Sequence, residues 1–262
     1  MAHEKQLKAA IGAAKAAGKV LLKHYGTGLT KKMKGKLDFA TQADLESQAL
    51  IKRSLASAFP GYSFLGEEDK SHSADYGGYK WIVDPLDGTI NYALGLPWFC
   101  VSIALAKDGE PVVGVLYQPL SRELFTATKG GGAFLNGKRI SVSKKPLEEL
   151  ALGISISHLR NNTLRVVKHL PFLQPACLRI RSIGSIAEEV CNVASGRFGA
   201  YYNLISTPWD FSAAKVVVEE AGGVASDIEG KHWRPDSPNI LVANSRRSQK
   251  ILIDAIRKGE KK

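Results

Sequence analysis

Two aspartates, Asp84 and Asp87, stand three residues apart in the stretch KWIVDPLDGTINY at 80–92. The apolar residues before them predict a strand, which we expect to end at Asp84 because Pro85 lacks the amide hydrogen that sheet pairing uses. Two carboxylates at a buried strand end need compensation, since burying an unpaired charge is costly. A divalent cation between them is one solution. The alternative is a turn ordered by hydrogen bonds from the side chains to the backbone.

The residues that follow add an anion site. Gly88 and Thr89 open a predicted helix, TINYALG, and the first N–H groups of a helix have no partner within it. Such groups bind phosphate, and an anion site beside two carboxylates is consistent only with a cation between them. The backbone carbonyl of Leu86 adds a hard oxygen ligand, so the set suits Mg²⁺. The aspartates alone do not decide between the cation and the turn.

Another acidic stretch, FLGEED, follows a short predicted strand and a glycine. Its Glu67 and Glu68 could supply further oxygen ligands, whereas the usual role of such residues is a charged surface loop. A third acid, Asp210 in TPWDFSAA, lies three residues after Thr207, which matches a helix capping box. Asp44 in TQAD repeats this spacing after Thr41. Asp44 and Asp210 could therefore be caps only.

The composition is that of an ordinary globular chain of 262 residues, 44% hydrophobic and 23% charged, long enough for a large core. No apolar run is long enough to span a bilayer, and the N-terminal residues have helical apolar spacing rather than the continuous core of a signal peptide. Three cysteines at unrelated spacings indicate neither a disulfide framework nor a zinc site. We therefore expect a cytoplasmic protein without a membrane partner.

The net charge of +11 raises the question of an anionic partner such as nucleic acid. The densest basic run, TKKMKGK at 30–36, has no interleaved aromatic residues, and a second run, RKGEKK, is the C-terminal tail. Runs of this kind usually form solvated surface. Nucleic acid is therefore the weaker expectation.

The elements that must position the acids fall into two halves that share one fold. Residues 1–144 predict α+β structure, with two amphipathic helices, two short strands and an antiparallel meander from Phe99 to Val142 that turns at Asn136 and Gly137. Residues 145–262 predict alternating α/β structure. In order, its expected elements are LGISIS, TLRVVKHL, CLRIRSI, SIAEEVCNVAS, GAYYNLI, PWDFSAAKVVVEEAGG, GVASDI, NILVANS and SQKILIDAIRK.

GEED, WIVDPLDGT and WDFSAAKVVVEEAGG, in this order, resemble the three signature motifs of the inositol monophosphatase family. The likeness covers nearly the whole chain and includes TQAD and IRSIGSIAEEVCNVASGRFGAYY. This family consists of magnesium-dependent, lithium-sensitive phosphomonoesterases. The resemblance implies a layered α-β-α-β-α sandwich, a homodimer, and a metal site at the junction of the halves.

The resemblance also implies a role for each matching residue. The metal ligands would be the side chains of Glu67, Asp84, Asp87 and Asp210 and the carbonyl of Leu86. Gly88 and Thr89 would bind the phosphate, Thr89 and Asp44 would orient and deprotonate the attacking water, and Glu68 would assist from behind the ligands. Two or three Mg²⁺ ions would activate that water for direct attack, so no covalent phosphoenzyme forms.

The substrate is less constrained than the reaction. Gly184, Ser185, Asn203 and Asp210 match substrate-contacting positions, but inositol-preferring members carry an acid where this chain has Asn203, and a smaller residue where it has Ile186. Inositol 1-phosphate is our first expectation. Histidinol phosphate, fructose 1,6-bisphosphate and nucleotide 3′-phosphates stay open.

The basic loop from Lys31 to Lys36 matches the family's mobile active-site loop, so one of its lysines could approach the phosphate; the alternative is solubility alone.

Two rival functions fit parts of the sequence. Phosphatases of the haloacid dehalogenase type use D-x-D-G-T with a nucleophilic aspartate, but D-P-L-D-G-T has one residue more, and GEED and WD have no part in that chemistry. The second rival is a basic RNA- or protein-binding factor on the same scaffold, which only the charge supports.

Overall fold

The computed structural model describes residues 3–27, 31–33, 39–71, 75–156 and 160–261. Its N-terminal elements are α1 (Glu4–His24), β1 (Lys31–Met33), β2 (Phe39–Thr41), α2 (Gln42–Ala58), β3 (Ser63–Gly66), β4 (Tyr79–Asp87), α3 (Thr89–Ala93), β5 (Cys100–Lys107), β6 (Glu110–Gln118), β7 (Glu123–Thr128), β8 (Gly132–Leu135) and β9 (Lys138–Arg139). The C-terminal helices and strands are β10 (Ala151–Ile154), α4 (Arg160–Leu173), β11 (Arg179–Arg181), α5 (Ile186–Ala194), β12 (Phe198–Asn203), α6 (Pro208–Glu220), β13 (Val224–Ser226), β14 (Ile240–Ala243) and α7 (Arg246–Glu260). Short 3₁₀ turns occur at Leu147–Glu149 and Gln174–Ala176.

A seven-stranded sheet forms the first half, in the order β3-β4-β5-β6-β7-β8-β9. Its strands pair antiparallel from β4 onward, which confirms the predicted meander, whereas β3 pairs parallel with β4. The predicted hairpin turn connects β8 and β9, where Asn136 has φ 50° and Gly137 φ 77°. Positive φ at both central residues is the geometry of the tight turns that suit the twist of a hairpin.

The strand that carries the paired aspartates is longer than the sequence predicts. We expected β4 to end at Asp84, but it runs to Asp87, with its register to β5 shifted between these two residues. Asp84 lies opposite Ser102, and Asp87 lies opposite Cys100. Pro85 is accommodated in this irregularity, where no ladder N–H is required. The consequence is a local bend that displays both aspartates at one sheet end.

The second half holds a five-stranded sheet in the order β11-β10-β12-β14-β13. Strand β10 pairs parallel with β11 and β12, while β14 pairs antiparallel with β12 and β13. Strands connected through helices in this way confirm the predicted alternation.

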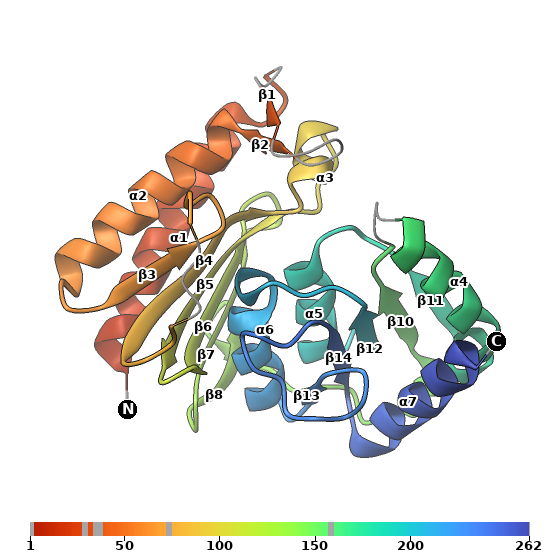
Figure 1. Cartoon of the computed structure of the whole chain (residues 1–262). Coiled ribbons are helices and arrows are strands. Elements are labelled where there is room, and N and C mark those ends of the chain that lie inside the picture. The colour runs from red at the N-terminus through yellow and green to blue at the C-terminus, as the bar shows by residue number, and fades with distance from the viewer. Residues whose placement is uncertain (1–2, 28–30, 34–38, 72–74, 157–159, 262) are drawn as a thin grey trace.

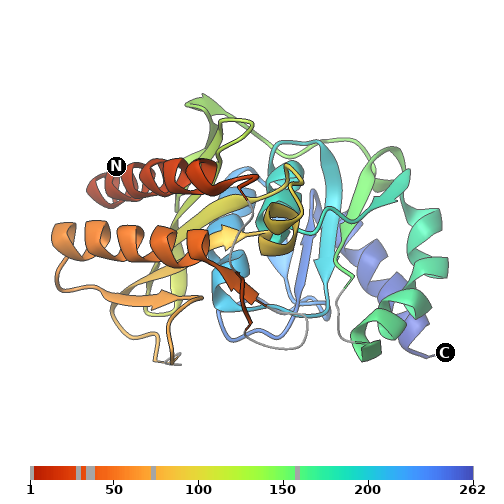
Figure 2. The ribbon, with the colours of Figure 1, turned by 90° about the horizontal axis from the view of Figure 1, so that it is seen from above.

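The two sheets and the helices stack in five layers (Figure 1). Helices α1 and α2 lie side by side on the outer face of the large sheet, as Figure 2 also shows, and contact β4, β5 and β6. Helices α5 and α6 fill the space between the sheets, and α4 and α7 cover the outer face of the small sheet. The predicted α-β-α-β-α sandwich is therefore confirmed.

Three apolar clusters occupy the spaces between these layers. The largest lies around α5 and α6, so the middle layer contributes to a core shared by both halves. Asn244 strengthens the connection between the halves, since its side chain donates hydrogen bonds to the carbonyls of Ser143 and Lys145, each at 2.9 Å. The predicted boundary between the two halves of the chain, at residue 144, stays a prediction.

In the described part of the chain, no helix is long and apolar enough to cross a membrane. Part of the basic loop, Lys31–Met33, pairs antiparallel with β2. Lys34 and Lys36 lie outside the described residues, so the role predicted for this loop stays a prediction.

Candidate active site

Asp84 and Asp87 are buried at the bent end of β4, with exposed fractions of 2% and 7%. The backbone N–H of Leu86 donates to Asp84 Oδ1 at 2.9 Å. This is the turn-ordering bond that the sequence left as an alternative to a cation site. It engages one oxygen of Asp84, so the ordered turn and a ligand role are compatible.

Asp87 joins the two halves of the fold. Its Oδ2 accepts hydrogen bonds from Ser185 Oγ at 2.6 Å and from the backbone N–H of Ala187 at 2.8 Å. Both donors lie at the start of α5, where unsatisfied N–H groups and the helix dipole stabilise a negative charge. Burial nevertheless raises the pKa of Asp87 to about 6. The start of α5 thus holds Asp87 in the junction between the sheets.

Asp210 reaches the same junction from the first turn of α6. Its Oδ2 accepts the backbone N–H of Thr207 at 3.0 Å, so the predicted capping box is present. The helix start is fastened beside Asp84, because Ser102, the partner of Asp84 on β5, donates to the carbonyl of Trp209 at 3.3 Å. Asp210 can therefore cap α6 and also belong to the acid cluster.

The four predicted carboxylate ligands affect one another electrostatically. The pKa of Asp84 is raised well above its usual range, first by burial and then by the charges of Glu67, Asp87 and Asp210. Burial, followed by the charges of Asp87 and Glu67, raises the pKa of Asp210 to about 8. The acids of GEED, DPLD and WD therefore act on one another although they are far apart in sequence, and their shared role as metal ligands stays a prediction.

The four carboxylates and the carbonyl of Leu86 are oxygen donors of the kind that bind a hard divalent cation. Carboxylate oxygens with a nearby backbone carbonyl are the ligands that Mg²⁺ prefers. Within the described residues, no three acidic, histidine or cysteine side chains already surround one ion-sized position. Burial raises the pKa of Asp84 most, and the charge of Glu67 and a side-chain contact with Glu67 raise it further. A cation among these acids would offset the repulsion between their charges.

Asp44 and Thr89 form a hydrogen-bonded pair beside the cluster. Asp44, fully buried, caps α2 by accepting from the N–H of Thr41 at 2.8 Å and from its hydroxyl. Its other oxygen lies 3.2 Å from Thr89 Oγ1, which also lies 3.0 Å from the carbonyl of Leu86. One hydroxyl proton can serve only one acceptor at a time. If the Leu86 carbonyl binds a cation, the proton is left to Asp44.

Gly88 caps α3 and has no room for a side chain. Its φ is 89°, a conformation that other residues rarely adopt, and a Cβ atom there would lie 2.6 Å from the carbonyl oxygen of Trp98. This close contact between Gly88 and the backbone of Trp98 sets the direction of the first N–H groups of α3, which include the N–H of Thr89. The predicted role of Gly88 in phosphate binding stays a prediction with this steric basis.

The remaining predicted residues lie around the junction. Ser185 is buried, and its hydroxyl donates a hydrogen bond to Asp87, which is one of the proposed metal ligands. Asn203 ends β12, and its Oδ1 accepts the N–H of Ile205 at 3.2 Å.

Ile186 is half-buried and packs on the core. Glu68 is half-buried, and its N–H donates to Gln48. Their predicted substrate and catalytic roles stay predictions.

Sequence reasoning missed Asn91, which ties α3 to the loop before α5. Its side-chain amide donates to the carbonyls of Trp98 and Ile183, each at 2.9 Å. The same amide packs against Gly184, where a Cβ atom would lie 3.3 Å from it. An asparagine within the first turn after a Gly-Thr pair was the available signal, but it does not reveal partners 92 residues away.

Two further acids, Glu188 and Glu189, are buried in the first turn of α5. Glu189 Oε1 accepts the N–H of Ile183 at 2.8 Å, and no hydrogen-bond partner is found for its Oε2 among the described residues. Burial is the main cause that raises the pKa of each to about 8. Both carboxyls are therefore largely protonated at neutral pH.

We expect these two acids to make the protein less stable as the pH rises. The folded chain holds their protons up to about pH 8, whereas the unfolded chain releases them near the usual pKa of 4.5. Stability is therefore lost between these values, by at most about 1.4 kcal/mol per pH unit for each group. Glu189→Gln should lose less free energy of unfolding between pH 6 and pH 8, measured with urea in EDTA. Parallel losses in Glu189→Gln, the wild type and the exposed control Glu148→Gln would contradict this assignment.

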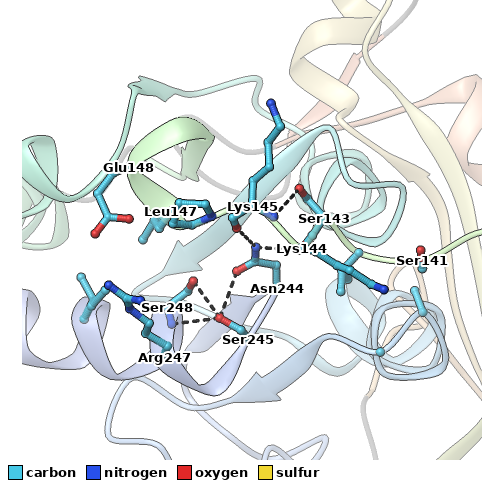
Figure 3. Close-up of a pocket in the computed structure, with 15 residues that line it drawn as sticks. Ser141, Ser143, Lys144, Lys145, Leu147, Glu148, Asn244, Ser245, Arg247 and Ser248 are labelled. Atoms are coloured by element: carbon cyan, nitrogen blue, oxygen red, sulfur yellow. Dashed lines mark hydrogen bonds between the residues drawn. The ribbon is translucent and has the colours of Figure 1, made fainter.

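A cavity of about 620 Å³ lies elsewhere, between the connection of the halves and the start of α7 (Figure 3). Its lining includes Ser143, Lys144, Asn244 and Arg247, and also Ala221 at the end of α6. Asp210 lies in the first turn of α6, about 16 Å away along the helix at 1.5 Å per residue. None of the four junction carboxylates lines this cavity, so it is separate from the candidate active site.

The five layers, with acids from both halves at their junction, define a layered α-β-α-β-α protein with a candidate active site at that junction. Comparison with known proteins narrows the class: the chain belongs to the inositol monophosphatase family, whose sequence model matches residues 2–261. Members of this family are phosphatases that act on phosphoric monoesters and generally depend on metals, so the predicted family and enzyme class are confirmed.

Individual relatives match over nearly their whole length. The chain is 36% identical to the inositol-1-monophosphatase of Rhizobium meliloti, covering 98% of each chain. It is 36% identical to the Nus factor SuhB of Escherichia coli, covering 95% of this chain and 94% of that one. The solved structure of inositol monophosphatase from Anabaena aligns with a TM-score of 0.87 at 32% identity, over 98% of this chain and 97% of that chain.

Proposed function

We propose that this protein is a Mg²⁺-dependent phosphomonoesterase that hydrolyses a small phosphorylated metabolite, with inositol 1-phosphate as the first candidate. The observation that carries the proposal is the mutual influence of Glu67, Asp84, Asp87 and Asp210, acids from three separate stretches, next to the hydrogen-bonded pair of buried Asp44 and half-buried Thr89. Acids that raise one another's pKa values favour the binding of cations over structural use alone, because a cation would offset the repulsion between their charges.

The four carboxylates and the carbonyl of Leu86 would hold the ions. Two or three bound Mg²⁺ ions would neutralise the phosphate, lower the pKa of a water and stabilise the leaving alkoxide. The chain itself would orient the reactants. The N–H groups at the start of α3, at Gly88 and Thr89, would bind phosphate oxygens, which are favoured at the positive end of a helix.

Asp44 is the proposed general base. Its buried carboxylate accepts a hydrogen bond from the Thr89 hydroxyl. The lone pairs of Thr89 Oγ1 are then left to accept a hydrogen bond from the attacking water. The water oxygen bonds to phosphorus as the ester P–O bond breaks, and the water proton passes through the Thr89 hydroxyl to Asp44. The leaving alkoxide takes up a proton from solvent, so products are an alcohol and inorganic phosphate.

The test is phosphate release from a substrate panel: inositol 1-phosphate, histidinol phosphate, fructose 1,6-bisphosphate and a nucleotide 3′-phosphate, each with Mg²⁺ and with EDTA. We expect Mg²⁺-dependent release, fastest from inositol 1-phosphate. Incorporation of ¹⁸O from labelled water into the released phosphate, together with a failure to trap an aspartyl-phosphate on Asp84, would support direct attack by water. Release from no monoester at any Mg²⁺ concentration would contradict the proposal, and preference for another monoester would change only the substrate.

A second candidate function, association with RNA or the transcription machinery, is supported by two observations: the net charge of +11 and the relative named Nus factor SuhB. It is compatible with catalysis. Tight RNA binding that weakens steeply with salt, together with no phosphate release from the panel, would favour this function over the first. We also propose that the protein is cytoplasmic, as its three cysteines at unrelated spacings indicate, and a homodimer, as the family resemblance implies. Sedimentation measurements of the purified protein can test the homodimer.

A further inference from the structure

The loop Gly66–Asp69, which carries the proposed ligand Glu67, is fixed by hydrogen bonds from every one of its backbone N–H groups. Within the loop, the N–H of Gly66 donates to Asp69 Oδ2 at 3.0 Å, and the N–H of Asp69 donates to the carbonyl of Gly66 at 3.2 Å. The N–H of Glu67 donates to the carbonyl of Val83 at 3.1 Å, immediately before Asp84. The loop is therefore attached to β4 beside the acid cluster.

The fourth N–H group depends on a side chain from another element. The N–H of Glu68 donates to Gln48 Oε1 on α2 at 2.9 Å, and Gln48 Nε2 donates to Asp69 Oδ1 at 3.3 Å. Gln48 is only 6% exposed. Its amide lies directly on Gly66, where a Cβ atom would come within 2.4 Å of Oε1. One buried amide thus contacts three of the four loop residues.

The same helix also carries the proposed general base. Gln48 follows Asp44 by four residues, so both lie on one face of α2, and both are buried. Asp44 contacts Thr89 beyond the end of β4, and Gln48 contacts the loop that presents Glu67. Helix α2 therefore sets the position of the base and of a ligand loop relative to each other.

We propose that Gln48 is a positioning residue, which orients the Glu67 carboxylate toward Asp84 by holding the loop on α2. This inference rests on the proposed function, because it assigns Gln48 a role in Mg²⁺ affinity. Removing the amide leaves the N–H of Glu68 without its acceptor and releases Asp69 from one donor. Groups that orient metal ligands typically change metal affinity by about 10- to 100-fold. The chemistry of the loaded enzyme should change little.

The experiment measures Mg²⁺ binding by calorimetry and, separately, kcat at saturating Mg²⁺. Gln48→Leu keeps a similar volume but removes both hydrogen bonds, and we expect about 10-fold or weaker Mg²⁺ binding with kcat nearly retained. Gly66→Ala, which must displace the Gln48 amide, should weaken binding in the same direction. The matched control is Lys52→Met: Lys52 donates to the same Asp69 Oδ1 at 2.9 Å but is half exposed, and binding should not change.

A reciprocal exchange separates positioning from general damage to the fold. Gln48→Glu keeps an acceptor for Glu68 but places a second carboxylate against Asp69, so Mg²⁺ binding should weaken. Adding Asp69→Asn restores an amide–carboxylate pair with the partners exchanged, and Mg²⁺ binding should recover. Mg²⁺ affinities of Gln48→Leu and Gln48→Glu equal to that of the wild type would overturn the inference. Failure of the wild type to bind Mg²⁺ at all would instead refute the proposed function.

Discussion

Asp84→Asn should lose at least about 10³-fold in kcat/KM while remaining folded. Asp84 is the acid whose pKa burial and all three other carboxylates raise, so it lies at the electrostatic centre of the cluster. An asparagine oxygen can still accept the N–H of Leu86, which preserves the bend at the end of β4. What is lost is the negative charge that would bind the cations. Phosphate release at several Mg²⁺ concentrations measures the effect.

The same substitution should raise stability in the absence of metal. In EDTA the wild type must either hold a proton on Asp84 or keep a buried charge among like charges, and two charges 4 Å apart repel by about 4 kcal/mol at an effective dielectric constant near 20. The neutral asparagine side chain removes that cost, so the melting temperature in EDTA should rise, and stabilisation by Mg²⁺ should largely disappear. Asp254→Asn, at an exposed position on α7, is the control that should change neither quantity. Retention of more than a tenth of the activity in Asp84→Asn would contradict the ligand role.

Asp44→Asn should reduce kcat by about 10² to 10⁴-fold with little change in KM, the range typical of a lost general base. The asparagine oxygen can keep the helix cap to Thr41, but its amide group would face Thr89 as a donor, so no proton acceptor remains there. Because burial raises the pKa of Asp44 to about 6, the wild-type rate should fall as the pH drops through that region and the base becomes protonated. The variant should lack this acidic decline.

Thr89→Val provides the matched test of the pair, since it keeps the shape of Thr89 and removes the hydroxyl. If Asp44 and Thr89 act as one unit, the double variant should be about as slow as either single variant. Multiplying losses would show that they act separately, and the proposed proton path through Thr89 would be wrong.

Local patterns in the sequence predicted most helices and strands, because apolar periodicity and caps are local, but they missed the short strands β1 and β2. The boxes at Thr41 and Thr207 occur where the spacing predicted them, and each contains a proposed functional acid. The end of β4 was predicted wrongly, because the missing N–H of Pro85 favours a strand end, whereas a shift in register accommodates the proline within the strand.

The arrangement of the site depends on contacts that spacing does not encode. Asp87 is held by Ser185 and Ala187, about a hundred residues away, and this pairing follows from how α5 packs between the sheets. The same holds for Gln48, which in sequence is one more polar residue on an amphipathic helix. Its partners become visible only when the loop after β3 is placed against α2. The family resemblance supplied the identity of the ligands but not these supporting bonds.

The most direct test of the central claim is a crystal structure with Mn²⁺ in place of Mg²⁺ and with phosphate, in which anomalous scattering locates the metal. We predict Mn²⁺ within about 2.5 Å of carboxylate oxygens of Glu67, Asp84, Asp87 and Asp210 and of the carbonyl oxygen of Leu86, with phosphate at the start of α3. Anomalous peaks only at other places, or these carboxylates too far apart to share an ion cluster, would contradict the account.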